Sequence, residues 1–238
     1  MIENILNKFI KIFIQEVSKL SNIHVSEKLI SFLTFLPVFF ISLGIHEFAH
    51  AFSASKLGDD TAKNLGRLTL NPFKHADLVG TYLMPIASFA SGFALIGWAK
   101  PVPVNRAKFK NHFRDDAIVS FAGPFSNLIL SLLFFAGFII ISGFGIQFKN
   151  YILDFCWYGV FLNIFLFAFN LLPIPPLDGS HILFDLFPNK FTAKLLNLGI
   201  YGSIILMVFI YSPLWQYFMK FINLILSLFV KTAEVFNV

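Results

Sequence analysis

Apolar side chains in this chain are gathered into six long runs, with polar and charged side chains in the segments between them. The runs cover residues 29–57, 78–99, 117–144, 151–172, 195–213 and 214–230. Each run approaches or exceeds the roughly 20 residues that an α-helix needs to cross the hydrocarbon layer of a bilayer. Backbone polar groups find no water there, so these runs predict helices, which satisfy those groups internally. The pattern predicts an all-α membrane protein, a polytopic helical bundle with about five or six apolar segments.

The first 20 residues follow a different pattern, in which apolar positions recur at helical spacing with lysines and glutamates between them. This spacing is typical of an amphipathic helix that lies at the membrane surface, and a short spanning segment is the alternative. The stretch lacks the uncharged core and the cleavage site of a secretory signal, so we expect it to remain in the mature protein. We therefore expect 1–28 to be an interfacial N-terminal helix and 29–238 to be one integral membrane domain.

The composition agrees with this prediction. Hydrophobic residues make up 57% of the chain and charged residues only 13%, against about a quarter charged residues in ordinary soluble domains. These values disfavour a disordered chain, and the single cysteine, Cys156, disfavours a disulfide scaffold. The net charge is +5, and in so apolar a chain a basic excess favours contact with anionic lipid head groups over nucleic acid. The partner that composition predicts is the lipid bilayer.

The first apolar run contains the motif HEFAH, from His46 to His50. Two histidines at positions i and i+4 lie on one helix face and can reach the same metal ion, while Glu47 between them can take a proton from water at the metal. An ionisable residue at membrane depth costs roughly 2.5 to 3.5 kcal/mol on insertion scales, so three of them together need a reason. The alternative is a polar cluster that joins helices through hydrogen bonds.

A catalytic zinc site normally takes three protein ligands, so this motif needs one more. Asp178 is the candidate, because it follows an apolar run within NLLPIPPLDG, residues 170–179. The three prolines of this segment prevent the helix from continuing, and Gly179 permits a tight turn, so the carboxylate is held on a stiff, bent segment. The alternative is that Asp178 caps a short helix over 180–187.

HEFAH, the later LDG sequence and AGPFSN (122–127) between them together resemble the site-2 protease family of intramembrane zinc metalloproteases. The resemblance covers residues 40–190. It implies that His46, His50 and Asp178 bind one Zn²⁺ and that Glu47 is the general base. Asn170 matches a family position that helps to bind the substrate backbone or the developing oxyanion.

Two further segments resemble the compact branch of this family, which has neither a PDZ domain nor a nucleotide-sensing domain. They are GRLTLNPFKHADLVGT (66–81) and GWAKPVPVN (97–105). The second corresponds in position to a short extended membrane-embedded element. Since a helical peptide bond is closed to attack, pairing with an unwound substrate at such an edge would present the bond for hydrolysis.

The run 78–99 is interrupted by glycines and a proline, which suggests a re-entrant segment. If all six runs crossed the bilayer, HEFAH and Asp178 would face opposite sides and could not easily share a metal. If 78–99 dips in and returns, both motifs lie on one side. Lysine and arginine counts do not separate these models, so the metal requirement favours re-entry. It places the basic loops 56–77 and 100–116, and the active site, on the cytoplasmic side of what we expect to be a prokaryotic cell membrane.

The reaction predicted is hydrolysis of a peptide bond in or near a transmembrane segment of another membrane protein. The competing hypothesis is a non-hydrolytic membrane zinc-binding protein or zinc carrier that uses the same ligands. A carrier is expected to have further ionisable residues along a path through the bundle, and the runs offer only the isolated Asp154 and Lys220. The substrate and the oligomeric state are not predicted.

Four other residues have side chains whose chemistry allows either a functional or a structural role. His75 either approaches the metal or substrate, or is a hydrogen-bonded or solvated loop residue. Asn127 is interpreted as a contact between packed helices, and Cys156 as a core residue. His181 is interpreted as structural, although it is close enough to Asp178 in sequence to support a ligand.

Overall fold

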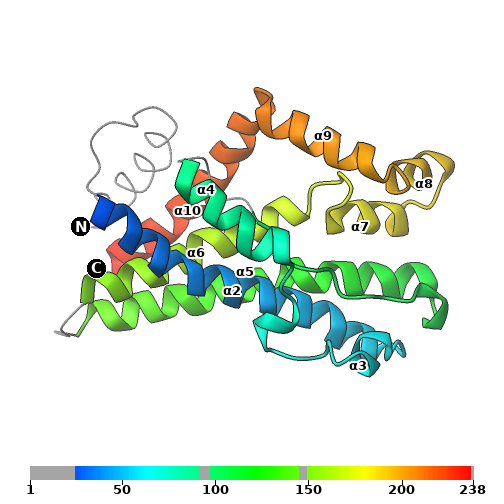
Figure 1. Cartoon of the computed structure of the whole chain (residues 1–238), viewed down its shortest axis with the longest axis horizontal. Coiled ribbons are helices and arrows are strands. Elements are labelled where there is room, and N and C mark those ends of the chain that lie inside the picture. The colour runs from blue at the N-terminus through cyan, green and yellow to red at the C-terminus, as the bar shows by residue number, and fades with distance from the viewer. Residues whose placement is uncertain (1–24, 92–96, 145–148, 237–238) are drawn as a thin grey trace.

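Three long helices form the centre of the molecule. The computed structural model describes residues 25–91, 97–144 and 149–236, so the predicted N-terminal helix over 1–20 lies outside the described residues. Helices α2 (Val25–Lys56), α5 (His112–Ser142) and α6 (Lys149–Asn170) pack against one another (Figure 1). All three are long and apolar enough to cross a membrane, which confirms the predicted class of all-α membrane protein.

The last two apolar runs form helices of different character. Helices α8 (Lys190–Leu196) and α9 (Ile200–Tyr211) meet at an angle of 85°, next to Gly199, whose φ of 54° favours glycine. The bent pair counts as at most one span, so the described residues contain three candidate spans, or four with this pair. Helix α10 (Leu214–Val235) is not among them, because polar side chains recur along it. The described parts of the six runs are thus largely helical. Fewer than six of these helices are long and apolar enough to cross a membrane.

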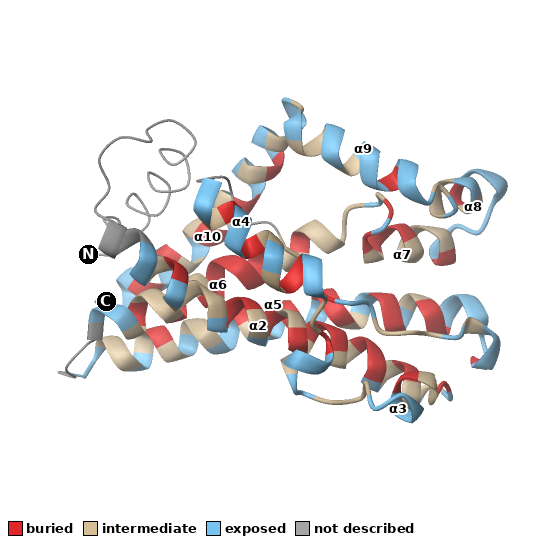
Figure 2. Cartoon of the chain, viewed as in Figure 1, coloured by how far each residue is buried: buried red, intermediate tan, exposed pale blue. Residues whose placement is uncertain are grey.

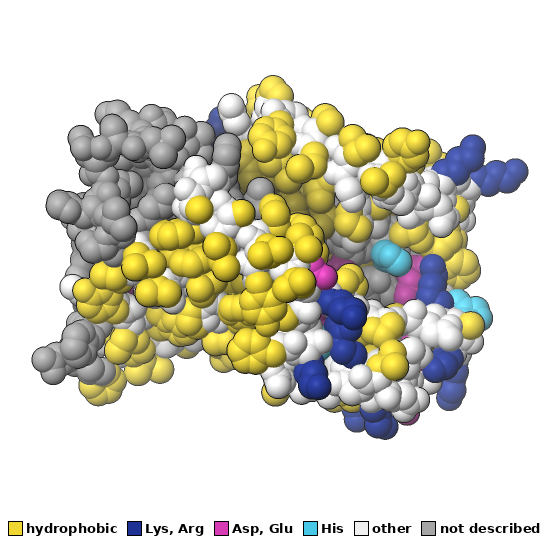
Figure 3. Space-filling model, viewed as in Figure 1, with side chains coloured by type: hydrophobic (Ala, Val, Ile, Leu, Met, Phe, Trp, Pro, Cys, Tyr) yellow, Lys and Arg dark blue, Asp and Glu magenta, His cyan; other side chains and the backbone are white. Residues whose placement is uncertain are grey.

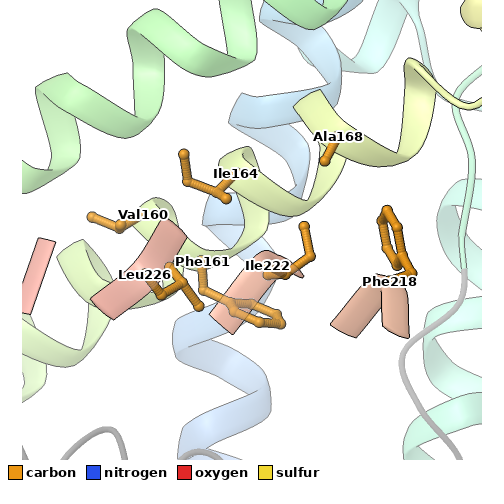
Figure 4. Packing of buried hydrophobic residues seen from close by; sticks show 7 residues of the cluster. All are labelled: Val160, Phe161, Ile164, Ala168, Phe218, Ile222 and Leu226. Carbon is orange, nitrogen blue, oxygen red and sulfur yellow. The ribbon is translucent and has the colours of Figure 1, made fainter. Parts of the chain in front are cut away.

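Helix α10 packs on α6 through a cluster of buried apolar side chains, shown in Figure 4. Phe218, Ile222 and Leu226 of α10 recur every four residues and therefore lie on one face. They meet Val160, Phe161, Ile164 and Ala168 of α6. Figure 2 shows that buried residues concentrate along the adjoining faces of the central helices, while α9 is largely exposed.

The described parts of the segment 78–99 lie against α2, where Phe89 stacks on Phe32 and Tyr82 contacts Phe40, and the two ends of the segment meet. It forms a π-helix, η2 (Leu78–Leu83), followed by α4 (Met84–Ser91). The chain that follows comes back beside its own start, where Ala76 pairs with Ala99 in an isolated antiparallel bridge. The Trp98 N–H donates to the carbonyl oxygen of Gly80 at 3.1 Å. The described residues 78–91 and 97–99 therefore do not form one straight crossing helix, and the two ends of the segment lie side by side, as the re-entrant interpretation requires.

The remaining elements are short. They are α3 (Thr61–Asn64), η1 (Pro72–Lys74), η3 (Arg106–Lys108) and α7 (Asp178–Leu186). Helix α7 packs against α5. A Cβ atom on Gly179 would clash with the carbonyl oxygens of Leu171 and Leu172, so the tight return of the chain after α6 requires glycine there.

Candidate metal centre

Two histidine side chains from one turn of α2 face each other at the centre of the site. His46 and His50 are 6% and 8% exposed, and their Nε2 atoms are 3.0 Å apart. The i, i+4 spacing places both rings on the same helix face, as the sequence predicts. This face of α2 is covered by α5, which excludes solvent from the two rings.

Asp178 meets this pair from the far end of the sequence. Its Oδ2 atom lies 3.2 Å from His46 Nε2 and 3.4 Å from His50 Nε2. Asp178 begins α7, whose N-cap residue is Leu177, so its carboxylate faces the histidines and does not cap the helix. The structure therefore brings together all three predicted ligands.

In a neutral ring, the hydrogen bonds of each histidine place the proton on the nitrogen that faces away from the other histidine. His46 Nδ1 lies 2.6 Å from Asn127 Oδ1, and His50 Nδ1 lies 2.7 Å from the carbonyl oxygen of Val119. Both oxygens are acceptors, so each Nδ1 carries the donated proton, and in the neutral ring each Nε2 has a lone pair. Two lone pairs then face a carboxylate oxygen of Asp178 that is itself buried without a donor. A metal cation bound among these three atoms would remove their mutual repulsion.

The dimensions of the group fit zinc. Zinc binds nitrogen and oxygen ligands at about 2.0 to 2.1 Å in a tetrahedral arrangement, which separates neighbouring ligand atoms by about 3.3 Å. The three separations here are 3.0, 3.2 and 3.4 Å. Two imidazole nitrogens and one carboxylate oxygen also match the donor set of catalytic zinc sites, which leave a fourth position for water or substrate.

Gly123 on α5 lies directly against both histidine rings. A Cβ atom at this position would clash with His50 Nε2 and would lie 2.7 Å from His46 Cε1. Only glycine permits this approach of the two helices. Gly123 was not predicted to have a role, although its place in AGPFSN, beside the interhelical Asn127, was the available signal.

Glu47 is tied to the extended segment after the hairpin. Its Oε2 atom accepts a hydrogen bond from the Val102 N–H at 2.7 Å, and the residue is 8% exposed. Three positions further along this segment, the Asn105 N–H donates to Asp59 Oδ2 at 2.6 Å. Burial opposes ionisation of Asp59, but the hydrogen bonds from Asn105 and Thr61 outweigh it and lower the pKa of Asp59. Two carboxylates thus hold the backbone of GWAKPVPVN beside the site.

The other residues considered from sequence lie in different surroundings. Asn170 Nδ2 donates to the carbonyl oxygen of Leu166 at 3.0 Å, within its own helix. His75 is buried and its Nε2 lies 2.9 Å from the carbonyl oxygen of Thr69, so it is a hydrogen-bonded loop residue. Cys156 is buried in an apolar cluster with Trp157. His181 Nδ1 lies 3.6 Å from Asp116 Oδ2, which places this histidine in a neighbouring ionic cluster.

That cluster connects α7 to α5 and to the loop before it, and it was not predicted. Arg106 Nη2 donates to Asp185 of α7, and Arg106 Nε lies 3.1 Å from Asp116 Oδ2 of α5. Burial raises the pKa of Asp185 to about 7, and the negative charge of Asp116 adds to the effect while Arg106 opposes it. The residues are far apart in sequence, so no local pattern pointed to them. Figure 3 shows the hollow at this end of the molecule, with acidic, histidine and basic side chains around it.

Comparison with known proteins agrees with the site. The model of peptidase family M50 matches residues 34–152 and 145–210. YwhC of Bacillus subtilis, named as a putative zinc metalloprotease, is 44% identical over 181 residues, which are 74% of this chain and 80% of YwhC. Rip2 of Mycolicibacterium smegmatis, named likewise, is 31% identical over 189 residues, 76% of this chain and 68% of Rip2. No solved structure is similar to the chain at a significant level.

The family match extends over most of the chain and includes His46, His50, the excursion 78–99 and Asp178. The group of three potential metal ligands and the apolar helices are what such an enzyme requires. The chain therefore belongs to peptidase family M50, the site-2 protease family, and is a zinc metalloprotease of the membrane.

Proposed function

We propose that this metalloprotease hydrolyses a peptide bond in or beside a transmembrane segment of another membrane protein. The observation that carries the proposal is the position of HEFAH within Leu29–Lys56, a 28-residue apolar helix long enough to cross a bilayer. A site built on such a helix is accessible to substrates that are themselves in the membrane.

The proposed ligands are His46, His50 and Asp178, and Glu47 is the proposed general base. These residues would hold the zinc ion, which would supply Lewis-acid chemistry at the scissile carbonyl group and at the attacking water. Glu47 accepts the proton of the attacking water and later delivers it to the leaving amine. The hydrogen bond from Val102 N–H to Glu47 Oε2 restrains this carboxylate beside the histidines.

The extended segment 97–105 is the proposed binding edge for an unwound substrate. Hydrogen bonds to Glu47 and Asp59 keep its backbone extended, and strand addition would present a peptide bond in an open conformation. Asn170, the last residue of α6, is proposed to steady the substrate backbone. For this it must release the carbonyl oxygen of Leu166, to which it donates in the present structure.

We place the active site toward the cytoplasmic side of a prokaryotic cell membrane. The basic connectors 56–77 and 100–116 lie on one side if 78–99 is re-entrant, and the return of Ala99 to Ala76 supports that geometry. Figure 3 shows hydrophobic side chains over much of one face and lysine and arginine side chains gathered at one end of it. Such an end is suited to the lipid head groups and the cytoplasm.

Replacing Glu47 with Gln tests the reaction. The carboxylate of Glu47 is not needed to hold zinc in this proposal, so Glu47→Gln should bind zinc normally and lose at least about 100-fold in peptide-bond cleavage. Comparison of membrane proteins from cells with wild-type or Glu47→Gln enzyme should reveal uncleaved substrates in the variant. The control is Glu234→Gln, which changes an exposed glutamate of α10 and should cleave normally. Near-normal cleavage by Glu47→Gln would refute the assigned base.

A zinc carrier with the same ligands is the competing function. It predicts zinc flux across proteoliposomes that Glu47→Gln does not abolish, with no cleavage of membrane proteins. The proposed protease predicts the reverse, cleavage that depends on Glu47 and no zinc flux above that of empty vesicles.

A further inference from the structure

A chain of buried hydrogen bonds runs from the metal ligand His46 across three helices. Its other members are Asn127 on α5, Asn163 on α6 and Ser42 on α2, and each of these residues is 0% exposed. We propose that Asn163 is a positioning residue that, acting through Asn127, keeps the metal-binding nitrogen of His46 free of a proton. This inference rests on the proposed role of His46 as a zinc ligand.

Two backbone carbonyl groups give the chain its direction, because a carbonyl oxygen can only accept. Asn163 Nδ2 donates to the Gly159 carbonyl oxygen of its own helix and to Ser42 Oγ, both at 2.8 Å. The amide oxygen of Asn163 is therefore turned toward Asn127, whose Nδ2 donates to it at 2.8 Å. The same Nδ2 reaches the carbonyl oxygen of Ser42 at 3.3 Å.

The orientation of the Asn127 amide decides which nitrogen of His46 carries the proton. With its NH₂ group engaged by Asn163 and Ser42, Asn127 presents only its oxygen to His46 Nδ1, at 2.6 Å. The proton of a neutral His46 ring must then be on Nδ1, and Nε2 keeps the lone pair that a metal requires.

The reversed amide would have the opposite effect. The NH₂ group of Asn127 would face His46 Nδ1, and the ring proton would move to Nε2, the atom that lies 3.2 Å from Asp178 Oδ2. The amide oxygen of Asn127 would at the same time face the oxygen of Asn163 and the carbonyl oxygen of Ser42. Asn163 therefore disfavours the orientation in which a proton occupies the metal-binding position.

Asn163→Leu tests the proposal, because leucine removes the acceptor at similar volume. The affinity of the purified protein for zinc, measured by competition with a chromophoric chelator, should fall about tenfold. Nitrogen-15 spectra of histidine-labelled, zinc-free protein should show the Nε2–H form of His46, assigned by its absence from His46→Ala. The matched control is Ser131→Ala, which removes an equally buried hydroxyl of α5 that donates to the Leu128 carbonyl oxygen. It should change neither measurement.

A double-mutant cycle separates positioning from packing. In Asn127→Asp both side-chain oxygens accept, so the proton of His46 stays on Nδ1 whatever residue 163 offers. Asn163→Leu should therefore lower zinc affinity when Asn127 is present and leave it unchanged in the Asn127→Asp background. Equal losses of zinc affinity in the two backgrounds, or an unaltered His46 tautomer in Asn163→Leu, would overturn the proposal.

If the leucine variant does not fold, Ser42→Ala supplies the same two measurements, zinc affinity and the His46 tautomer, since it removes one acceptor that orients Asn163.

These measurements use zinc alone and need no substrate. A wild-type protein that binds zinc but cleaves no membrane protein would contradict the proposed function and leave the role of Asn163 intact. A tautomer and a zinc affinity that do not respond to Asn163→Leu, in an enzyme that cleaves its substrate, would contradict the role of Asn163 alone.

Discussion

At the scale of single residues, Gly123 is the contact that lets α5 reach His46 and His50, the two proposed ligand histidines. Its missing side chain leaves space for His50 Nε2 and His46 Cε1, both of which a Cβ atom would overlap. Each ring also donates its Nδ1 proton to an oxygen of α5, from Asn127 or Val119. The same helix therefore shapes the pocket for the rings and sets their tautomers.

Gly123→Ala should damage the metal site more than the fold. The added methyl group must push a ligand ring or move α5, an overpacking that costs about 1 to 3 kcal/mol, and zinc affinity should fall by about 10-fold or more. Chelator competition measures the affinity and thermal unfolding in detergent measures the fold. Gly137→Ala is the control on the same helix, because its Cβ atom would be 3.6 Å from Cys156 Sγ, an ordinary contact. Equal zinc affinities for the two variants would show that the rings accommodate the methyl group.

At the scale of elements, α7 is held by its two ends. Asp178 at its start meets the histidines of α2, and Asp185 near its end meets Arg106, which also contacts Asp116 of α5. The chain that joins α6 to α7 is bent by prolines, so the helix has no continuous helical connection to the bundle. The ionic cluster therefore helps to keep Asp178, the proposed third ligand, in place.

The stability of this docking should depend on pH through Asp185. Its pKa is raised to about 7, from an ordinary value of 3.8, so the folded protein binds this proton more tightly than the unfolded protein does. The stabilisation is complete below the ordinary pKa and is lost as the pH rises through about 7. The unfolding temperature in detergent should therefore fall between about pH 4.5 and pH 7 in the wild type, level off above that, and fall less in Asp185→Asn.

Asp60→Asn is the control for this experiment. Asp60 is a carboxylate whose pKa is lowered, chiefly by a hydrogen bond from Ser55 and also by the nearby Lys63, so it does not titrate in this pH range. Its variant should keep the wild-type slope. A slope for Asp185→Asn that equals the wild-type slope would mean that Asp185 does not bind the proton.

At the scale of the whole molecule, the metal site joins parts of the chain that are distant in sequence. His46 and His50 come from α2, and Asp178 comes from α7 after the hairpin and two further long helices. A bound ion would therefore crosslink α2 to α7 through side chains. The stability of the folded protein should rise with zinc, since an unfolded chain does not assemble the three ligands.

Removal of zinc should lower the unfolding temperature of the detergent-solubilised protein. At a free zinc concentration of about 100 times the dissociation constant, binding adds about 2.7 kcal/mol to the free energy of unfolding. Thermal unfolding with and without 1,10-phenanthroline measures the difference, and added zinc should restore it. His46→Ala should show no dependence on zinc, whereas Glu47→Gln should respond as the wild type does. A zinc effect of equal size in His46→Ala would point to binding elsewhere.

Much of the fold and the site follows from local sequence. Continuous apolar runs predict helices because a membrane leaves the backbone no other partner, and the spacing of His46 and His50 places two ligands on one face. The prolines before Asp178 cannot continue a helix, so they predict a bend in the chain just before this residue. What these patterns leave open is which runs cross, since Gly199 bends one of them and polar residues recur along α10.

The sequence by itself determined the membrane class, the two histidines with their acid and the candidate third ligand, because each depends on spacing or composition within one segment. Tertiary structure alone decided that Gly123 lies against the ligand rings, that Asn163 contacts Asn127, and that Arg106 joins α7 to α5. These contacts link residues on different helices, and their geometry depends on how the helices pack. The sequence pattern of one helix shows which of its faces is buried, but it does not specify which side chains of another helix contact that face.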